Sequence, residues 1–271
     1  MAYEWKNKVV LITGGATGIG AVVVRLIVGE GVKHVRVLDI NEKAGIELQN
    51  ELNSKYGANM VKFAKCDVTN EEQFIGLMKA VAEEQGLDVV INNAGIMNDS
   101  LEVYKKALQI NVIALATGTI KAMELMSKEH GGRGGTIINI SSIAALFIDH
   151  LFPVYMGAKS FVLQFSNCIG TDEYYLRTGV RVVTMCFGAT DTGLLHTTNV
   201  GNFDPVINAT MAEKIARFPL QTIDNAAQGL VEAFKTAKSG STWISTTNRP
   251  VKDITPTVTK AYDLLAVHVF E

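Results

Sequence analysis

The sequence predicts an α/β protein: one doubly wound domain in which a seven-stranded parallel sheet is flanked by helices. Two observations predict this fold. Runs that are continuous in Val, Ile and similar residues alternate with helical stretches almost to the end of the chain, and continuous runs are typical of strands buried on both faces. The first run is followed directly by a glycine-rich turn and a helix, which is how many doubly wound sheets begin.

Local signals set the limits of these elements. Thr69-Asn70-Glu71-Glu72 resembles a capping box and begins the third helix. Gly86 and Gly179 stand where helices are expected to stop. The expected strands cover residues 8–13, 34–39, 61–66, 87–92, 136–141, 180–186 and 241–245. The expected helices cover residues 18–29, 42–56, 70–85, 100–129, 151–177 and 223–237.

The turn after the first strand is rich in glycine. It reads Thr-Gly-Gly-Ala-Thr-Gly-Ile-Gly over residues 13–20 and leads into a helix. Glycine lets the main chain approach a pyrophosphate closely, and a helix N-terminus offers free N–H groups and the positive end of a dipole. The turn therefore predicts a binding site for the phosphates of a dinucleotide.

Asp39 closes the second strand, 19 residues after Gly20. An acid at this place in a βαβ unit accepts hydrogen bonds from the adenosine ribose and repels a 2′-phosphate. Ile40 follows it, and no basic residue stands in the glycine turn to offset that phosphate. NAD is therefore predicted as the cofactor in preference to NADP. The alternative role of Asp39 is an N-cap for the helix that begins near Glu42.

Polar and small residues follow further strands, at the sheet edge where doubly wound folds bind ligands. Asp67-Val68 follows the third strand, where an acid can reach an adenine amino group, and a turn or cap role is equally open. Residues 92–95, Asn-Asn-Ala-Gly, close the fourth strand, where the main chain runs close to a cofactor or forms a hydrogen-bonded turn. Asn111 lies inside an expected helix, where Asn is unfavourable, and indicates a kink or a held water.

Tyr155 and Lys159 are four residues apart on an expected helix, so they lie on one face. A phenol with a pKa near ~10 is a poor base at neutral pH, but a neighbouring cation lowers that pKa. Ser142, thirteen residues upstream, closes the fifth strand and adds a hydroxyl. These three groups together suit the interconversion of an alcohol and a carbonyl.

Composition narrows the remaining possibilities. Apolar residues make up 48% of the 271 residues and no linker divides the chain, so one domain over residues 1–271 is expected. The net charge of −2 gives no reason to expect nucleic acid or an anionic membrane as a partner. We expect no signal peptide, no membrane span and no metal site, because the matching patterns are missing from the sequence. Cys66, Cys168 and Cys186 are expected to be buried reduced thiols, which favours a cytoplasmic protein.

Taken together, these residues resemble the short-chain dehydrogenase/reductase family along essentially the whole chain. The glycine turn, residues 92–95, Asn111, Ser142 and the Tyr155/Lys159 pair match it in order and spacing. Within it, the chain is most similar to the insect-type alcohol dehydrogenases and to relatives of 15-hydroxyprostaglandin dehydrogenase. That narrower likeness rests on segments beginning at Gly132, Glu173 and Gly240.

The resemblance implies a Rossmann fold and an NAD-dependent alcohol dehydrogenase or reductase. It implies that Tyr155 is the general base in oxidation and the acid in reduction, and that Ser142 polarises the substrate oxygen. Lys159 would bind the nicotinamide ribose and lower the pKa of Tyr155, and Asn111 would hold a water that links Lys159 to solvent. The expected cofactor-binding residues are Gly14, Thr17, Gly18, Ile19, Gly20, Asp39, Ile40, Asp67, Val68, Asn93, Ala94, Gly95, Tyr155, Lys159, Gly188, Thr190 and Thr192.

The substrate is expected to be a hydrophobic alcohol or carbonyl compound. A largely apolar segment, about residues 189–222, is expected to cover the substrate pocket. Retinoid, isoprenoid, steroid, fatty and short alcohols all remain open. Phe187 stands where the family usually has Pro, which would alter the nicotinamide wall or the pocket entrance.

The helix over 151–177 carries more apolar surface than one buried face needs. The resemblance implies a twofold interface on this helix and its neighbour near 100–129, so a homodimer, or a tetramer built from it, is expected. The C-terminal tail, residues 247–271, is too apolar to stay solvated and is expected to close over its own pocket or to cross to the second subunit.

Three other interpretations stay open at this point. A nucleotide-sugar epimerase or dehydratase shares the Tyr-x-x-x-Lys pair but usually has a differently spaced glycine loop. A non-catalytic NAD-binding sensor would keep the fold, although the complete set of Asn111, Ser142, Tyr155 and Lys159 argues against it. A purely structural role leaves the glycine turn and Asp39 unexplained.

Overall fold

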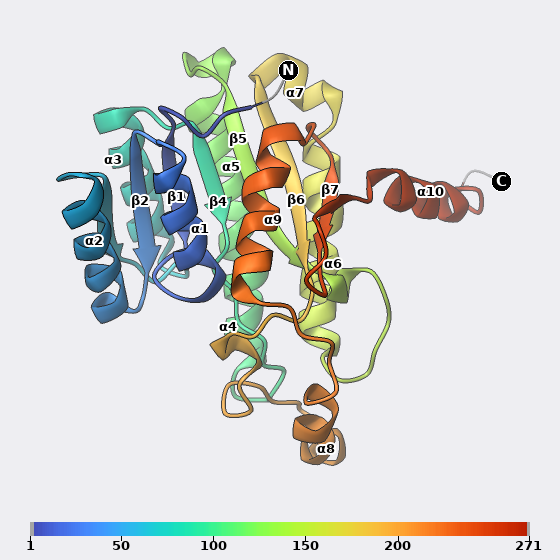
Figure 1. Ribbon diagram of the computed structural model, residues 1–271. Helices are drawn as coiled ribbons and strands as arrows, with labels where there is room; N and C mark the ends of the chain where they lie inside the picture. The colour runs from blue at the N-terminus through green and yellow to red at the C-terminus, as the bar shows by residue number, and fades with distance from the viewer. Residues whose placement is uncertain (1–2, 270–271) are drawn as a thin grey trace.

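The computed structural model describes residues 3–269 and contains one eight-stranded sheet with helices on both faces (Figure 1). The strand order is β3-β2-β1-β4-β5-β6-β7-β8. The order reverses between β1 and β4, which creates a crevice at the carboxyl ends of these strands. The strands are β1 Val9–Thr13, β2 His34–Asp39, β3 Val61–Lys65, β4 Val89–Asn92, β5 Gly135–Ser142, β6 Val180–Phe187, β7 Thr242–Ser245 and β8 Lys252–Asp253.

Two apolar cores hold the helices against the sheet. On one face α1 (Gly18–Gly29), α2 (Glu42–Tyr56) and α9 (Ile223–Thr236) bury residues such as Val24, Leu48 and Phe234. On the other face α3 (Glu71–Gln85) and α5 (Leu115–Met126) bury Phe74 and Met126, and α6 (Pro153–Ile169) lies beside them. Because both faces are covered, the central strands β1, β4, β5 and β6 are almost entirely buried, as their continuous apolar runs predicted.

Three elements differ from expectation. β8 is an additional strand, and it pairs with β7 antiparallel over only two residues, too short to leave a sequence pattern. The helix expected over 151–177 breaks into α6 and α7 (Asp172–Thr178). The break falls at Gly170, where a Cβ would lie only 2.5 Å from the main chain of Gly240.

The helix expected over 100–129 is also divided. α4 (Tyr104–Leu108) runs into a π-helical stretch, Gln109–Ala114, which continues as α5. Asn111 lies in that stretch, so the regular helix is interrupted at the residue that indicated a kink or a held water. Single π turns inside α-helices occur frequently at functional sites.

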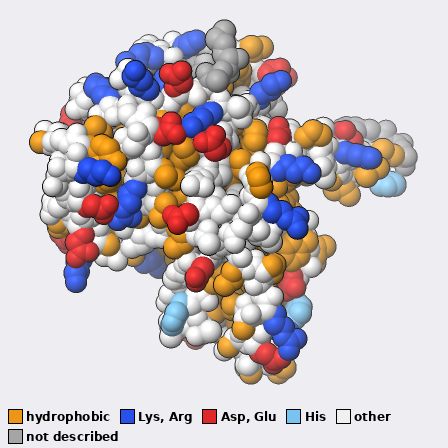
Figure 2. Space-filling view, viewed as in Figure 1, with side chains coloured by type: hydrophobic (Ala, Val, Ile, Leu, Met, Phe, Trp, Pro, Cys, Tyr) orange, Lys and Arg blue, Asp and Glu red, His pale blue; other side chains and the backbone are white. Residues whose placement is uncertain are grey.

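The segment 189–222 contains a 3₁₀ turn, Gly193–Leu195, and α8 (Pro205–Ile215). It lies beyond the carboxyl ends of the strands, at the foot of Figure 1. The tail forms α10 (Thr255–Ala266), which projects from the body of the molecule and carries hydrophobic side chains along its length (Figure 2). Phe270 and Glu271, the end of the predicted tail, lie outside the described residues, as do Met1 and Ala2.

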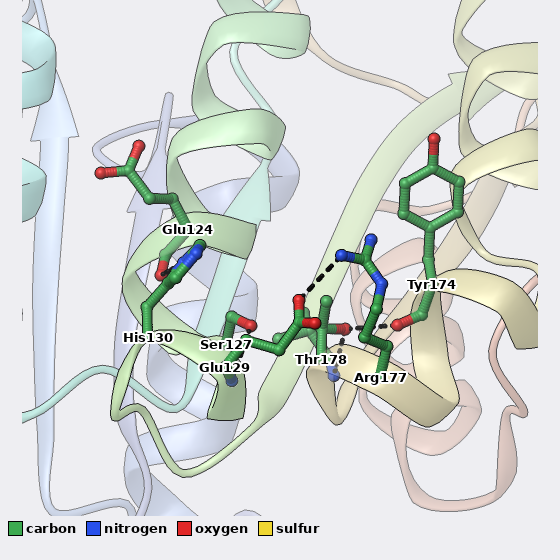
Figure 3. Close-up of polar contacts among 8 residues, drawn as sticks. Glu124, Ser127, Glu129, His130, Tyr174, Arg177 and Thr178 are labelled. Atoms are coloured by element: carbon green, nitrogen blue, oxygen red, sulfur yellow. Dashed lines mark hydrogen bonds and ion pairs between the residues drawn. The ribbon is translucent and has the colours of Figure 1, made fainter.

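Polar contacts join α7 to the turn after α5 near the amino ends of β5 and β6 (Figure 3). Arg177 of α7 forms a 2.9 Å ion pair with Glu129, which lies in the 3₁₀ turn Lys128–His130 after α5. A cavity of about 480 Å³ opens at the same end, among residues that include Lys8, Asp88 and Arg181. It is therefore at the sheet edge opposite the predicted site.

The cysteines differ in their exposure. Cys66 and Cys186 are buried as expected, but Cys168 is exposed on α6, so the expectation of burial was wrong there. Cys168 lies near the end of α6, on the side of the helix that faces solvent. Over residues 3–269, no helix has the length and apolarity needed to cross a membrane.

Candidate active site

The structure brings the four predicted catalytic residues into one buried site. Ser142 ends β5, Tyr155 and Lys159 lie on α6, and Asn111 lies in the π-helical stretch. None of these residues is more than 9% exposed. The Ser141 hydroxyl donates a 2.8 Å hydrogen bond to the Lys159 carbonyl and so fixes α6 to the end of β5.

Lys159 is held by main-chain oxygen and not by an acid. Its Nζ donates a 2.9 Å hydrogen bond to the Ile140 carbonyl and lies 5.6 Å from the centre of the Tyr155 ring. A Cβ on Gly95 would lie 2.8 Å from Asn111 Oδ1 and 3.6 Å from Lys159 Nζ. Gly95, Asn111 and Lys159 are therefore direct neighbours, and a larger residue than glycine would displace Asn111.

Asn111 binds the segment that follows β4 with both ends of its amide. Its Nδ2 donates a 2.7 Å bond to the Ile96 carbonyl, and its Oδ1 accepts a 3.1 Å bond from the Ile96 N–H. This pairing holds the side chain inside the structure, where it is fully buried. It explains why the helix accommodates an asparagine that would be unfavourable in a regular helix interior.

Ser142 is oriented by the main chain on two sides. Its Oγ donates a 3.3 Å bond to the Phe187 carbonyl and accepts a 3.1 Å bond from the Ala144 N–H. The Phe187 side chain is buried and packs in the core of α1, α9 and β6. The residue that replaces the usual Pro thus fixes Ser142 through its carbonyl and contributes its ring to the core.

Burial dominates the ionisation of the site. It raises the pKa of Tyr155 to about 12, an effect that Asp99 increases and a hydrogen bond with Ser142 opposes. Burial also lowers the pKa of Lys159 to about 8. In the protein itself, burial therefore outweighs the lowering of the Tyr155 pKa that was expected from Lys159.

The glycine turn is tightly packed against its own main chain and against the segment after β4. Gly14 and Gly18 have φ angles of +61° and +53°. A Cβ on Gly20 would lie 2.3 Å from the Gly14 carbonyl oxygen. Asn93 Nδ2 supports the turn by donating to the carbonyls of Thr13 and Gly14, at 3.0 and 2.8 Å. The helix α1 begins here without a side-chain cap, so its first N–H groups remain available to a ligand.

Asp39 lies beside this turn. Its two carboxylate oxygens accept 2.9 Å hydrogen bonds from the N–H groups of Ala16 and Asn41. The N-cap of α2 is Asn41, which accepts a bond from Ala44, so Asp39 does not cap that helix. Ile40 is 65% exposed next to Asp39 and offers an apolar surface at the same edge.

Among the other predicted cofactor residues, Asp67 and Val68 follow β3, and Thr190 and Thr192 lie at the start of the 189–222 segment. Asp67 forms a turn by accepting bonds from the N–H and hydroxyl of Thr69, and Val68 packs in the core. Thr190 donates to the Gly188 carbonyl and accepts from Gln221, so it fastens the base of the 189–222 segment. Thr192 lies against the glycine turn, because a Cβ added to Gly18 would be 3.7 Å from Thr192 Cγ2.

An apolar cluster surrounds Tyr155 on the side of the 189–222 segment. Phe147, Phe203 and Val206 lie outside it, 53%, 47% and 76% exposed. His196 forms a turn with Thr198 through its Nδ1. The buried members of the cluster are Met97, Leu151, Phe152, Tyr155, Met156, Met211 and Ile215, and the partly buried ones include Leu194, Leu195, Ile207 and Phe218.

Sequence reasoning missed Asp99. This residue is fully buried, and its carboxylate accepts hydrogen bonds from the N–H groups of Val154 and Tyr155 at the start of α6. A signal was available: α6 begins with Pro153, but Phe152 precedes it and has no side chain that can cap a helix. A cap from elsewhere in the chain was therefore required.

Comparisons with known proteins agree with this geometry. The family model of the short chain dehydrogenases matches residues 8–202. Human 15-hydroxyprostaglandin dehydrogenase [NAD(+)] is 34% identical over 191 residues, which are 70% of this chain and 71% of that protein. Alcohol dehydrogenase 1 of Ceratitis capitata is 32% identical over 245 residues, 88% of this chain and 91% of that protein.

The fold has a close counterpart among solved structures. A short-chain dehydrogenase/reductase from Burkholderia phymatum, solved in complex with NAD, superposes with a TM-score of 0.73. The match covers 85% of this chain and 86% of that chain at 20% sequence identity. The predicted doubly wound fold is thereby confirmed.

Proposed function

Because the chain belongs to the short-chain dehydrogenase family, as its motifs predicted, we propose that it is an NAD-dependent oxidoreductase acting on hydrophobic alcohols. A hydride passes between a primary or secondary alcohol and its aldehyde or ketone, with Tyr155 as general acid–base. The observation that carries this proposal is the burial of Tyr155, Ser142 and Lys159 together beside an apolar cluster. Such a site excludes water and accepts an apolar substrate.

The residues present fit NAD. The main chain at Gly14, Gly18 and Gly20 leaves room for a pyrophosphate at the start of α1. Asp39 places a carboxylate beside the turn, where the adenosine ribose of a bound dinucleotide would lie. Lys159 would hold the second ribose, and Thr192 lies close enough to the turn to contact the nicotinamide. When bound, NAD supplies the acceptor for the hydride.

The chain's own residues transfer the proton. In oxidation Tyr155 takes the hydroxyl proton of the alcohol, and in reduction its phenol returns that proton to the carbonyl oxygen. Ser142 would hold the substrate oxygen through its hydroxyl, which Phe187 and Ala144 already orient. Since burial raises the pKa of Tyr155 to about 12, the ammonium of Lys159 and the positive charge of oxidised nicotinamide are needed to stabilise the phenolate.

The direct test of this function is a screen of NAD reduction. Retinoid, isoprenoid, steroid, fatty and short alcohols are offered to the protein with NAD. Turnover of at least one apolar alcohol is expected, with longer apolar substrates preferred because the cluster around Tyr155 is apolar. Tight NAD binding without turnover of any of them would instead favour the non-catalytic sensor.

Cofactor choice should depend on the charge of Asp39. We expect kcat/KM for NAD to exceed that for NADP by about 100-fold, because the carboxylate repels a 2′-phosphate. Asp39→Asn removes the charge while keeping an oxygen toward Ala16, and it should reduce this preference by about tenfold. Steady-state kinetics with both cofactors measure the ratio, and equal use of NAD and NADP by the native protein contradicts the assignment.

Alcohol oxidation should accelerate with pH. The phenolate of Tyr155 is the base and its pKa is raised, so kcat/KM increases as the pH rises toward neutrality and beyond. Lys159 loses its charge above its pKa of about 8, which opposes the gain and flattens the profile there. Carbonyl reduction should show the reverse trend. A pH-independent oxidation rate, with a deuterium isotope effect showing that chemistry is rate-limiting, would exclude the phenolate mechanism.

The assembly we propose is a homodimer. Ile113 and Ile120 on the outer side of the α5 region and Phe161 on α6 are exposed, which is unusual for helices that also bury an apolar face. Leu264 and Leu265 are 63% and 66% exposed on the projecting α10. A second subunit would cover both groups.

Light scattering at micromolar concentration should therefore give twice the monomer mass. Deleting residues 251–271 should weaken the dimer, because it removes the apolar residues of α10. A monomer mass for the intact protein contradicts the dimer, and an unchanged mass and stability after truncation contradict a role of the tail in it.

A further inference from the structure

Asp99 caps the helix that carries Tyr155 from 55 residues away in the sequence. Its Oδ2 accepts a 2.6 Å hydrogen bond from the Val154 N–H, and its Oδ1 accepts a 3.1 Å bond from the N–H of Tyr155 itself. These are two of the N–H groups that a helix start leaves without an internal partner. The main chain of the general acid–base residue is thus held by a buried carboxylate.

The same residue is joined to the 189–222 segment by its main chain. The Asp99 N–H donates a 2.8 Å bond to the Gly201 carbonyl, and Asp99 forms a parallel bridge with Asn202. A Cβ at Gly201 would lie 2.8 Å from Asn98 Oδ1, so a larger residue there would displace the Asn98 side chain. Asn98 Nδ2 adds a 3.1 Å bond to the Asn199 carbonyl.

Asn202 completes the connection. Its Nδ2 donates a 2.8 Å bond to the Leu151 carbonyl, just before the first turn of α6. Asn202 is only 6% exposed and Asp99 is fully buried. The segment after β4, the start of α6 and the 189–222 segment therefore meet at one buried polar junction.

The charge of Asp99 is unusual. No cation within residues 3–269 forms a salt bridge with it, and burial raises its pKa. The helix dipole and the N–H groups of Val154 and Tyr155 are what oppose this rise and stabilise its charge. Tyr155 faces Ser142 from β5, Lys159 from its own helix and Asp99 from the segment after β4. Cys186 of β6 interacts with Lys159. Asp99 is the anionic group in this set, and it opposes ionisation of the tyrosine.

We propose that Asp99 is a positioning residue that couples the 189–222 segment to Tyr155, so that ordering of this segment by a substrate orders the start of the catalytic helix. Through its main chain Asp99 responds to Gly201, and through its carboxylate it sets the position of the Tyr155 main chain. The kinetic consequences rest on the dehydrogenase function proposed above, whereas the structural coupling is independent of that function.

Hydrogen exchange of the protein without substrate tests the coupling by itself. Asp99→Asn keeps one acceptor oxygen but replaces the other with an NH₂ group. That group cannot accept a bond from the N–H of Val154 or Tyr155, so one of the two bonds to α6 is lost. Amides at 154–156 and also at 199–204 should exchange about tenfold faster than in the native protein. Asp88→Asn is the matched control, because Asp88 also accepts a main-chain bond, from Val9, but at the opposite edge of the sheet. It should leave both regions unchanged.

Asn202→Ala is a second variant that leaves Asp99 intact. It removes the bond to the Leu151 carbonyl and also the acceptor of the Asp204 N–H, so exchange at 199–204 rises locally. Faster exchange at 154–156 as well is the sign of coupling. This variant keeps the proposal testable if Asp99→Asn fails to fold. Faster exchange confined to one of the two regions, in both variants, would overturn the coupling and leave Asp99 as a local cap.

Kinetics test the positioning role separately, because a purely structural role of Asp99 would leave the ratio of the kcat and KM effects and the pH profile unchanged. In Asp99→Asn, kcat should fall about 10- to 100-fold while the KM for NAD stays within about twofold, because a misplaced base affects chemistry more than cofactor binding. The oxidation profile should also shift to lower pH, because the nearby anion is lost. An unchanged kcat and pH profile would overturn the positioning role. If the native protein oxidises none of the alcohols, the proposed dehydrogenase function fails, and the exchange result still decides the coupling.

Discussion

Tyr155→Phe is expected to lower kcat for alcohol oxidation by about 10³-fold, while NADH binds with a Kd within about twofold of the native value. The ring is buried in the apolar cluster, and phenylalanine preserves that packing. The substitution removes the phenol oxygen, which exchanges the proton and forms a hydrogen bond with Ser142. Because the lost hydrogen bond is neutral, the free energy of unfolding should change by only about 1 kcal/mol.

Stopped-flow measurement of NADH formation and a fluorescence titration of NADH give the two quantities. Tyr56→Phe is a suitable control and should behave as the native protein does, because Tyr56 ends α2 and its hydroxyl lies near Gly29, at the end of α1 away from the glycine turn. If Tyr155→Phe kept most of its activity with any alcohol, another group would be the base.

Lys159→Met is expected to abolish turnover and yet to stabilise the fold. Lys159 is only 4% exposed, and burial lowers its pKa from 10.5 to about 8. A shift of this size corresponds to about 3 kcal/mol of destabilisation at pH 7. Methionine fills a similar volume without charge but leaves the Ile140 carbonyl without its donor, so a net gain of about 2 kcal/mol in the free energy of unfolding is expected.

The gain should depend on pH with a definite sign. Between about pH 8 and 10.5 the unfolded chain keeps the lysine proton that the folded protein has lost, so the stability of the native protein rises with pH in this window. The gain of the variant over the native protein should therefore be largest below pH 8. Above pH 10.5 it should reverse, leaving the variant about 1 kcal/mol less stable because the Ile140 carbonyl still lacks its donor. Urea unfolding at several pH values measures it, and a variant less stable than the native protein at pH 7 contradicts the account.

Much of this architecture was predictable because strands and turns carry local signals. Val/Ile runs located seven strands, and the glycine turn with Asp39 located the edge where the site lies. Asn111 was recognisable because an asparagine is unfavourable in a regular helix interior. The structure supplies the reason in its two bonds to Ile96.

What escaped prediction depends on contacts between distant residues. Asp99 lies in a polar segment without a periodic pattern, and its partners at α6 are more than 50 residues away. Gly170 ends α6 and Thr171 begins α7, a local signal that the prediction of one helix overlooked. The close approach of the Gly240 main chain, which leaves no room for a side chain at Gly170, is a contact between distant residues that the local sequence does not reveal. Burial of Tyr155 likewise reverses the expected direction of its pKa, since the depth of a side chain follows from the assembled fold.

The central claim is that this chain moves a hydride from an alcohol carbon to NAD through Tyr155. Its most direct test follows deuterium from the carbinol carbon of a labelled apolar alcohol, with mass spectrometry of the NADH that forms. The account predicts NADH that carries one deuterium with the native protein, and formation of this labelled NADH about 10³-fold more slowly with Tyr155→Phe. Unlabelled NADH from the native protein, or labelled NADH formed at the same rate by Tyr155→Phe, would contradict it.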